Sequence, residues 1–223
     1  MVFARPRITG VVLAAAIAAV AGCRDAARAR LRATTNATYD QRTGKLTQLT
    51  YDANRDGRID TWTEMDGTRP VMSRVDRDQD GVVDRWEYYD AQGRLEKVGF
   101  SRARRDKPDA WAYPDDAGRL ERVEVSSTGD PSKIDRRERY ATSGPVDADG
   151  LGALLSVEQD SDGDGKVDRW ETYEAGEIKT LELDENHDGI RDRRLTYKNS
   201  TVVLVESGPD GAGQYTRRVD VTP

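Results

Sequence analysis

Short runs of alternating apolar and polar residues recur along most of this 223-residue chain, and turns rich in Gly and Asp separate them. Within residues 83–89, for example, Trp86 and Tyr88 would share one side of a strand. A turn signal at 90–93 follows, and then a second short run at 94–100. No apolar pattern with the helical period of about 3.6 residues accompanies these runs. The pattern therefore predicts an all-β fold built from antiparallel β-hairpins.

These hairpins belong to a repeat of about 24 residues, which is the strongest organisational feature of the sequence. The clear copies are residues 51–62, 75–86, 159–170 and 183–194. Two worn copies lie between them, at 101–113 and 127–140, and a last remnant surrounds Asp210 and Gly211. Residues 141–152 interrupt the spacing, and we expect them to form a surface loop. We predict an antiparallel β-hairpin repeat array in an open, elongated or curved sheet, with a small propeller of two repeats per blade as the alternative.

The first residues of the chain break this pattern and indicate a targeting segment. Arg5 and Arg7 precede an almost wholly apolar run, residues 8–20, which is too short to span a hydrocarbon core roughly 30 Å thick. Residues 20–23, Val-Ala-Gly-Cys, follow directly and contain the only cysteine of the chain. This order of features resembles the lipobox of bacterial lipoproteins, whose signal peptide is removed and whose cysteine is acylated.

The resemblance implies a signal peptide at 1–22, a lipidated Cys23 that begins a tether at 23–38, and a repeat domain at 39–223. Several acyl chains would anchor the protein stably to a membrane, since each buried methylene contributes about 0.8 kcal/mol. We therefore expect a lipid-anchored protein of the cell envelope. Arg24 stands where an Asp would resemble the inner-membrane retention signal of enterobacterial lipoproteins, which favours the outer membrane.

Charge and composition exclude some partners and some folds. The formal net charge is −6, and it becomes −8 when Arg5 and Arg7 leave with the signal peptide. Nucleic acid is a poor partner for such an acidic protein, because nucleic-acid binding depends on Lys and Arg that contact phosphates. With Cys23 acylated, no cysteine remains for a disulfide. Few apolar residues are left to fill a deep core, so we expect the chain to fold around something other than a large hydrophobic interior.

Each clear repeat carries an acidic loop of the form Asp-x-Asp-x-Asp-Gly-x-x-Asp, whose positions we number from 1. Carboxylates at positions 1, 3, 5 and 9 and the main-chain carbonyl at position 7 can point at one centre, and Gly at position 6 permits the sharp turn. Calcium is a hard cation that takes about six to eight oxygen ligands. The loops therefore predict calcium sites. Magnesium suits them less, because it demands octahedral geometry and keeps its waters.

The predicted ligands occupy the same positions in every clear copy. They are Asp52, Asn54, Asp56, Arg58 and Asp60 in the first loop; Asp76, Asp78, Asp80, Val82 and Asp84 in the second; Asp160, Asp162, Asp164, Lys166 and Asp168 in the third; and Asp184, Asn186, Asp188, Ile190 and Asp192 in the fourth. Glu87 and Glu171 stand at position 12, where an EF-hand places a bidentate ligand. The first and fourth loops lack this Glu and carry Asn at position 3, so we expect them to bind more weakly. The worn copies have lost most ligands and are expected to bind nothing.

As a family, these loops resemble the calcium loops of EF-hands, dockerins, thrombospondin type 3 repeats and integrin-type FG-GAP hairpins. The FG-GAP loop lies between β-strands and stops at position 9, which suits this chain best. Outside the loops, residues 89–95, Tyr-Asp-Ala-Gln-Gly-Arg-Leu, weakly resemble the YD repeats of bacterial wall-associated and Rhs proteins, which form hairpin arrays. The FG-GAP and YD resemblances imply β-strands on either side of the loops. The alternative is helix-loop-helix, as in true EF-hands, but the flanks alternate aromatic and polar residues, contain Gly every few positions and lack an apolar period of about 3.6 residues.

Together these features predict a non-catalytic lipoprotein in which calcium rigidifies a β-hairpin scaffold. His187 is the only histidine and stands at position 4 of an acidic loop, where a solvent-facing role fits better than catalysis. A G-x-S-x-G motif is absent, and residues 163–166 lack the spacing of a phosphate-binding loop. The four ligand-spaced sets explain the abundant carboxylates better than acid–base catalysis does.

An alternative function is the binding of an envelope glycan or protein through an aromatic stripe. Trp62, Trp86, Trp111 and Trp170 stand at matching repeat positions and could line one face of the sheet. In the other interpretation they form the core and pack one hairpin on the next. We favour the core for a chain this poor in Leu, Ile and Val.

Overall fold

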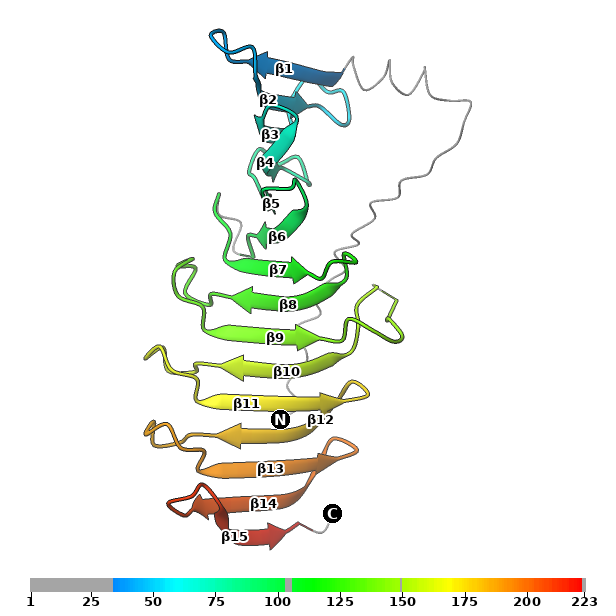
Figure 1. Ribbon diagram of the computed structural model, residues 1–223. Helices are drawn as coiled ribbons and strands as arrows, with labels where there is room; N and C mark the ends of the chain where they lie inside the picture. Colours follow the sequence, from blue (N-terminus) through cyan, green and yellow to red (C-terminus); the bar gives the residue numbers. More distant parts are fainter. Residues whose placement is uncertain (1–33, 103–105, 149, 222–223) are drawn as a thin grey trace.

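The computed structural model describes residues 34–102, 106–148 and 150–221. The predicted signal peptide, Cys23 and most of the tether lie outside this range, so lipidation stays a prediction. The described residues form an all-β fold with 15 strands in one antiparallel sheet, in which the strands follow one another in chain order (Figure 1). This confirms the predicted hairpin array. In the same range, no helix is long and apolar enough to cross a membrane.

The strands are short, and most contain five or six residues. Their bounds are β1 (Thr35–Tyr39), β2 (Leu46–Tyr51), β3 (Thr61–Asp66), β4 (Arg69–Val75), β5 (Arg85–Tyr89), β6 (Leu95–Phe100), β7 (Ala110–Pro114), β8 (Leu120–Val125), β9 (Arg136–Tyr140), β10 (Leu154–Gln159), β11 (Arg169–Glu174), β12 (Glu177–Leu183), β13 (Arg193–Lys198), β14 (Thr201–Pro209) and β15 (Tyr215–Asp220).

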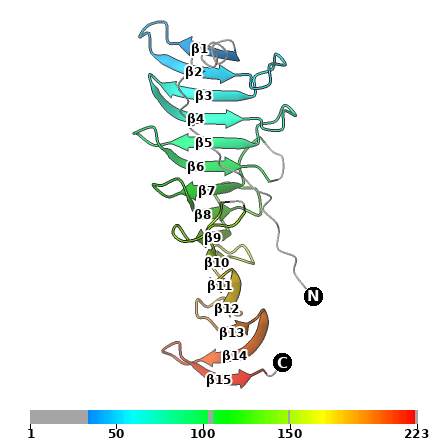
Figure 2. The ribbon, with the colours of Figure 1, turned by 90° about the vertical axis from the view of Figure 1, so that its right-hand side faces the viewer.

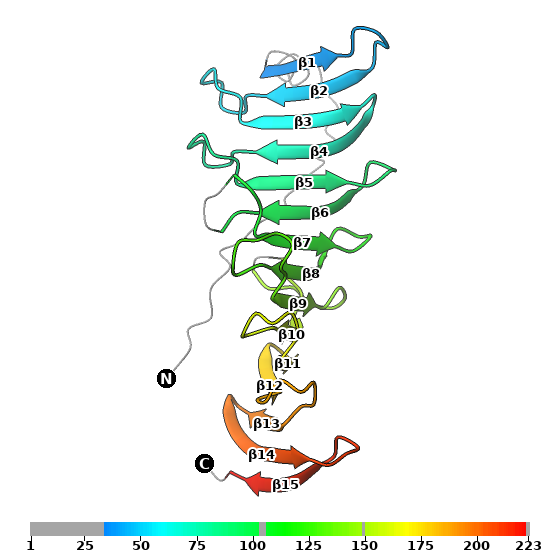
Figure 3. The same ribbon diagram turned by 90° about the vertical axis from the view of Figure 1, so that its left-hand side faces the viewer.

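The sheet is open, elongated and twisted along its length. The broad face of β7–β15 is visible in Figure 1, whereas the two views turned by 90° show the broad face of β1–β6 (Figures 2 and 3). Strands in a sheet are rotated relative to their neighbours, and this rotation accumulates over many strands. The propeller alternative is wrong, because the described strands form one continuous ladder rather than separate blades.

The connections alternate between the two long sides of the sheet, where the strands end; each of these sides is called an edge below. Because consecutive strands are antiparallel, every second connection lies on the same edge. The acidic loops follow β2, β4, β10 and β12, so all four lie on one edge, together with the worn loops after β6 and β8. The opposite edge carries short turns and the predicted surface loop at 141–152, whose described residues are mostly exposed. The repeat therefore stacks loop upon loop along a single edge.

Each face of the sheet contributes to a thin core. On one face, Trp62, Arg74, Trp86, Gly99 and Trp111 are consecutive cross-strand partners. Trp86 and Trp111 are only 5% and 7% exposed, which agrees with the core interpretation at these two positions, whereas the other two tryptophans are half-buried. Gly99 lies between them, and a Cβ there would stand 2.8 Å from Pro108 Cβ. Because Gly99 has no side chain, the loop after β6 can close over this face.

The other face buries a second row, in which apolar and acidic side chains alternate. Val98, Val123, Val157 and Leu181 are buried along this row. Glu138 lies directly between Val123 and Val157, and it is buried as well. A sheet with this little apolar burial depends on polar and ionic contacts to a greater extent than a sandwich with two packed layers does.

Candidate metal centres

The acidic loops share one scaffold of hydrogen bonds. The carboxylate at position 9 accepts a hydrogen bond from the backbone N–H at position 2, which closes the loop at its base. These bonds are Ala53 N to Asp60 Oδ2 at 2.7 Å, Arg77 N to Asp84 Oδ2 at 3.2 Å, Ser161 N to Asp168 Oδ2 at 2.9 Å and Glu185 N to Asp192 Oδ2 at 2.8 Å. The worn loops keep the same closure, through Asp109 and Asp135. Closure therefore does not by itself distinguish a candidate metal site.

Positions 1 and 6 form the second part of the scaffold. The carboxylate at position 1 accepts from the N–H of the glycine at position 6, at 2.8–3.0 Å in all four loops. These glycines, Gly57, Gly81, Gly165 and Gly189, have φ between +89° and +93°, a conformation that side chains rarely adopt. The predicted turn at position 6 is thus present. Glycine folds each loop back over its own first carboxylate.

Positions 5 and 7 complete the turn. The carboxylate at position 5 accepts from the N–H at position 7: Arg58 N, Val82 N, Lys166 N and Ile190 N lie 2.7–2.9 Å from their acceptors. The Arg58 N–H, followed by the Asn54 amide, holds the pKa of Asp56 below its ordinary value. Around Asp160, burial opposes such a shift, but the N–H groups of Gly165 and Gly163 keep its pKa low. Both carboxylates are therefore held in the charged form that a cation requires.

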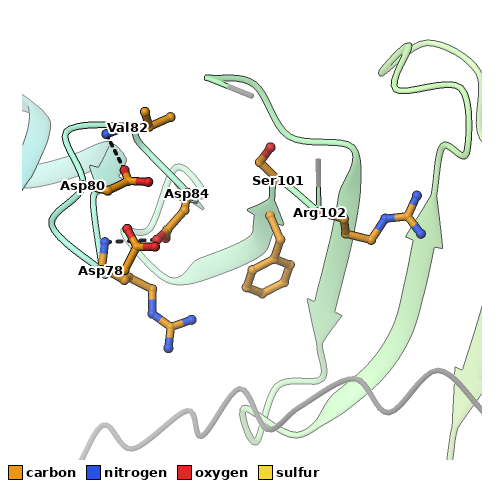
Figure 4. A pocket seen from close by; sticks show the side chains of 8 residues that line it. Asp78, Asp80, Val82, Asp84, Ser101 and Arg102 are labelled. Carbon is orange, nitrogen blue, oxygen red and sulfur yellow. Dashed lines mark hydrogen bonds between the residues drawn. The ribbon is translucent and has the colours of Figure 1, made fainter. Parts of the chain in front are cut away.

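Two loops bring three carboxylates close together. One oxygen each of Asp76, Asp78 and Asp84 lie within 4.8 Å of one another, and so do one oxygen each of Asp160, Asp162 and Asp164. Figure 4 shows Asp78, Asp80 and Asp84 gathered on the loop after β4, facing a hollow whose other wall includes Ser101. Burial raises the pKa of Asp84, which indicates a carboxylate short of solvent. Three of the four predicted carboxylates therefore converge in each of these loops, at positions 1, 3 and 9 of the second loop and at positions 1, 3 and 5 of the third.

Two carboxylate oxygens in these loops are buried without any hydrogen-bond donor. They are Asp76 Oδ1 and Asp184 Oδ1, both at position 1, and their side chains belong to residues only 6% and 5% exposed. A buried polar atom without a partner costs about 1–3 kcal/mol, and more when it is charged. Such an atom in a native structure requires an explanation, and a bound ion or water is one that fits a carboxylate oxygen.

These buried carboxylates lie where one acidic loop stacks on the next. Asp76 N donates to Asp60 O at 2.8 Å, and Asp184 N donates to Asp168 O at 2.9 Å. All four aspartates are buried, so each tandem pair of loops encloses two carboxylates at its interface. Buried carboxylates on adjacent loops repel each other unless a positive charge compensates them.

The worn loop after β6 solves the same problem with an arginine. Here position 9 is the buried Asp109, and the next loop begins with Ser126 in place of an aspartate. Arg102 Nε lies 3.3 Å from Asp109 Oδ1, and its Nη2 donates to Ser126 O at 3.1 Å. Where the acidic ligands are lost, the protein thus supplies its own positive charge at the stacking interface.

Glu87 and Glu171 are not brought to the loop carboxylates. Period-two alternation places position 12 on the sheet face with positions 10 and 14. There Glu87 accepts from Arg85 Nε at 2.8 Å and from the Tyr89 hydroxyl at 2.6 Å. Glu171 accepts from Arg169 Nε at 2.7 Å and from the Tyr173 hydroxyl. Because both oxygens already have donors in each case, we leave these two residues out of the candidate ligand set.

An Arg-x-Glu-x-Tyr trio therefore recurs on this face, although it is not among the groups predicted from the sequence. The third copy is Arg136, Glu138 and Tyr140, with Arg136 Nε at 2.7 Å and the Tyr140 hydroxyl at 2.6 Å from Glu138. Burial, followed by the nearby Glu87, raises the pKa of Tyr89 to about 12. The spacing of the three residues at alternate positions was the available signal, because alternate residues share a face of a strand.

Side chains also connect neighbouring loops. Position 3 of one loop contacts position 4 of the next: Asn54 Nδ2 donates to Gln79 Oε1 at 2.5 Å, and Asp162 Oδ2 lies 3.2 Å from His187 Nδ1. His187 thus pairs with an acidic loop residue at a half-exposed position. Ligand atoms of Asp162, Asp168 and His187 also lie within 4.8 Å of one another, so a metal-ligating group can form across the two loops.

Arg191 departs from the apolar pattern at position 8 and yet holds its loop to the sheet. Its guanidinium stacks on the Trp170 ring at 4.4 Å from the ring centroid and forms an ion pair with Glu182. At the same position, Ile59, Val83 and Val167 are partly buried. The fourth loop is therefore fixed to the sheet through a cation–π contact instead of an apolar one.

Comparisons with known proteins leave the family open. No protein-family model matches the chain, and no curated protein matches it either. Among solved structures, the matches include a TarM mutant from S. aureus in complex with fondaparinux, α-GlcNAc-glycerol and UDP, at 11% sequence identity and a TM-score of 0.33. That match covers 46% of this chain, and this chain spans about a fifth (21%) of the TarM structure. A similarity this low carries no argument about function.

Proposed function

We propose that this protein binds calcium ions in its acidic loops and that the ions stabilise the stacked hairpins. The observation that carries the proposal is the pair of orphaned, buried carboxylate oxygens of Asp76 and Asp184. Each lies at position 1 of a loop that also holds carboxylates at positions 5 and 9. A cation is the one partner that satisfies a dehydrated carboxylate oxygen and also neutralises its neighbours.

The donor set favours calcium over other cations. Carboxylate and main-chain oxygens are hard ligands, and the chain offers no cysteine in the loops and only one imidazole. Loops with five potential oxygen donors in an irregular arrangement suit a large ion with variable coordination better than they suit magnesium. The proposed ligands are positions 1, 3, 5 and 9 with the carbonyl of position 7, in the four loops 52–60, 76–84, 160–168 and 184–192.

The proposed role of the ions is structural. A single sheet buries little apolar surface, while the loops crowd carboxylates along one edge. A cation that binds the folded form more tightly than the unfolded chain stabilises by mass action. Together with the predicted lipid anchor at Cys23, this defines a non-catalytic, calcium-stiffened scaffold of the cell envelope. Burial of Trp86 and Trp111 favours packing over an exposed aromatic stripe, so a glycan- or protein-binding stripe is not proposed.

The test is calorimetric titration of the full chain, purified in detergent and stripped with EDTA, alongside thermal melting. We expect at least two calcium ions to bind and the melting temperature to rise by several degrees. Asp80→Ala should remove one ion. Asp116→Ala is the matched control, because Asp116 is fully exposed on the opposite edge and should leave binding unchanged. A titration without binding heat, and melting indifferent to EDTA, would contradict the proposal.

A further inference from the structure

The two loops of each tandem pair differ at position 1. In the first loops, both oxygens already have donors: Asp160 Oδ1 accepts from Gly163 N at 2.7 Å and Oδ2 from Gly165 N at 2.8 Å. Asp52 Oδ1 likewise accepts from the N–H at position 4, at 2.6 Å. In the second loops, only Oδ2 has a donor, and Oδ1 of Asp76 and of Asp184 has none. The carboxylate at position 1 therefore has donors for both oxygens in the first loops and for only one oxygen in the second loops.

Burial differs between the same residues. Asp52 and Asp160 are only half-buried, whereas Asp76 and Asp184 are buried. Asp76 and Asp184 each follow a complete loop, whose position 9 contributes the buried Asp60 or Asp168 directly beside them. In each tandem pair, position 1 of the second loop is therefore the one withdrawn from water, next to the buried position 9 of the first loop.

From this asymmetry we infer that each tandem pair fills in a fixed order, with the second loop taking its calcium before the first. The inference rests on the proposed function and deepens it. In the second loop, the cation gains an oxygen that has already lost its water and has no other donor. In the first loop, the matching oxygen has to be shared with a backbone N–H. Loops 76–84 and 184–192 are therefore the primary sites.

Ranking the loops by their number of aspartates gives a different filling order, which makes the inference testable. Loop 160–168 offers four aspartates, whereas loop 184–192 offers three and an Asn186 whose amide already hydrogen-bonds to Asp188. By charge alone, loop 160–168 would fill first. By dehydration and unmet hydrogen bonding, loop 184–192 fills first. The second pair thus separates the two explanations, while loop 76–84 is a primary site under both.

Contacts between the loops link calcium binding by the second loop to calcium binding by the first. His187, at position 4 of the fourth loop, touches the proposed ligand Asp162 of the third, and Gln79 makes the equivalent contact with Asn54. Position 4 has a positive φ in all four loops, including +60° at Gln79 and +61° at His187. A filled second loop fixes this residue, and the residue in turn holds position 3 of the first loop in place for its own ion.

The experiment uses four matched position-5 variants of the full chain: Asp56→Ala, Asp80→Ala, Asp164→Ala and Asp188→Ala. All four side chains are exposed, so folding should survive, and circular dichroism checks this for each variant. Calcium is titrated by calorimetry into EDTA-stripped protein. For the unmodified chain we expect two tight and two weaker ions, at least about tenfold apart in Kd, since an unmet buried oxygen has a free-energy cost of that order.

The variants identify the sites. Asp188→Ala and Asp80→Ala should each remove a tight ion, whereas Asp164→Ala and Asp56→Ala should leave both tight ions in place. Loss of a tight ion in Asp164→Ala but not in Asp188→Ala would overturn the filling order and leave the proposed function standing. Binding of four calcium ions with equal affinity would also overturn the filling order and leave the proposed function standing. If no calcium binds to any loop, both the order and the proposed function are wrong.

Discussion

Replacing Asp184 with asparagine should change stability in opposite directions with and without calcium. No group of the protein donates a hydrogen bond to Asp184 Oδ1, a buried carboxylate oxygen of a residue only 5% exposed. Asparagine keeps the shape of the side chain and the acceptor for Gly189 N while it removes the negative charge. The stabilisation comes from removing the buried charge, because an unpartnered charged group costs at least the roughly 1–3 kcal/mol of a neutral one. Asp184→Asn should therefore stabilise the EDTA-treated protein by about 1–3 kcal/mol.

In calcium the same substitution should destabilise the protein. A ligand is lost, and an ion present at a hundredfold excess over its Kd contributes about 2.7 kcal/mol to stability. For a chain of this size, each kcal/mol corresponds to a shift of about 2–4 °C in melting temperature. Thermal melting followed by circular dichroism, with EDTA and then with calcium, measures both effects on one sample.

Asp160→Asn provides the matched control for this prediction. Both oxygens of Asp160 accept backbone N–H groups, so the amide group of asparagine would turn one acceptor into a clashing donor. This variant should lose stability in EDTA as well as in calcium. If Asp184→Asn and Asp160→Asn lower the melting temperature equally in EDTA, the orphaned oxygen does not have the cost that we assign to it.

Three further predictions follow from other contacts. Arg102→Ala leaves the buried Asp109 without its arginine and should destabilise by about 1–3 kcal/mol, measured by urea unfolding; if the loss is absent, Arg102 is not the internal substitute for a cation. Glu171→Ala should cost a similar amount, about 1–3 kcal/mol, without changing the number of calcium ions in a calorimetric titration, and a lost ion would restore Glu171 as a ligand. Burial raises the pKa of Tyr89 and of Tyr113 from 10.0 to about 12, so the stability that they contribute is present below pH 10.0 and is lost as the pH rises through about 12. Ultraviolet titration of the folded protein should therefore show these two tyrosines ionising late. Ionisation of all tyrosines near pH 10.0 would contradict this.

The overall architecture could be predicted because its signals are local. Alternation within runs such as 83–89 and the Gly-Asp turns between them determine strands and hairpins without any knowledge of distant contacts. Chain-order stacking then follows from the repeat, since sequential strands usually pair with their neighbours. The closure of each acidic loop is equally local, because positions 1, 2, 6 and 9 satisfy one another within nine residues.

The features that could not be predicted depend on neighbouring repeats. The burial of Asp76 and Asp184 arises only when one loop stacks on another, and nothing within a single loop distinguishes them from Asp52 and Asp160. Glu87 was assigned by counting along an EF-hand, in which position 12 lies on a helix. On a strand, the same count places it on the sheet face beside Arg85 and Tyr89.

The most direct test of the central claim is a count of bound calcium. The full chain in detergent is equilibrated by dialysis against calcium at physiological salt, and elemental analysis measures the metal on the protein and in the buffer. We predict at least two calcium ions per chain, removed by EDTA together with a lower melting temperature. Calcium at the buffer level on the folded protein would contradict the claim that these loops are metal sites.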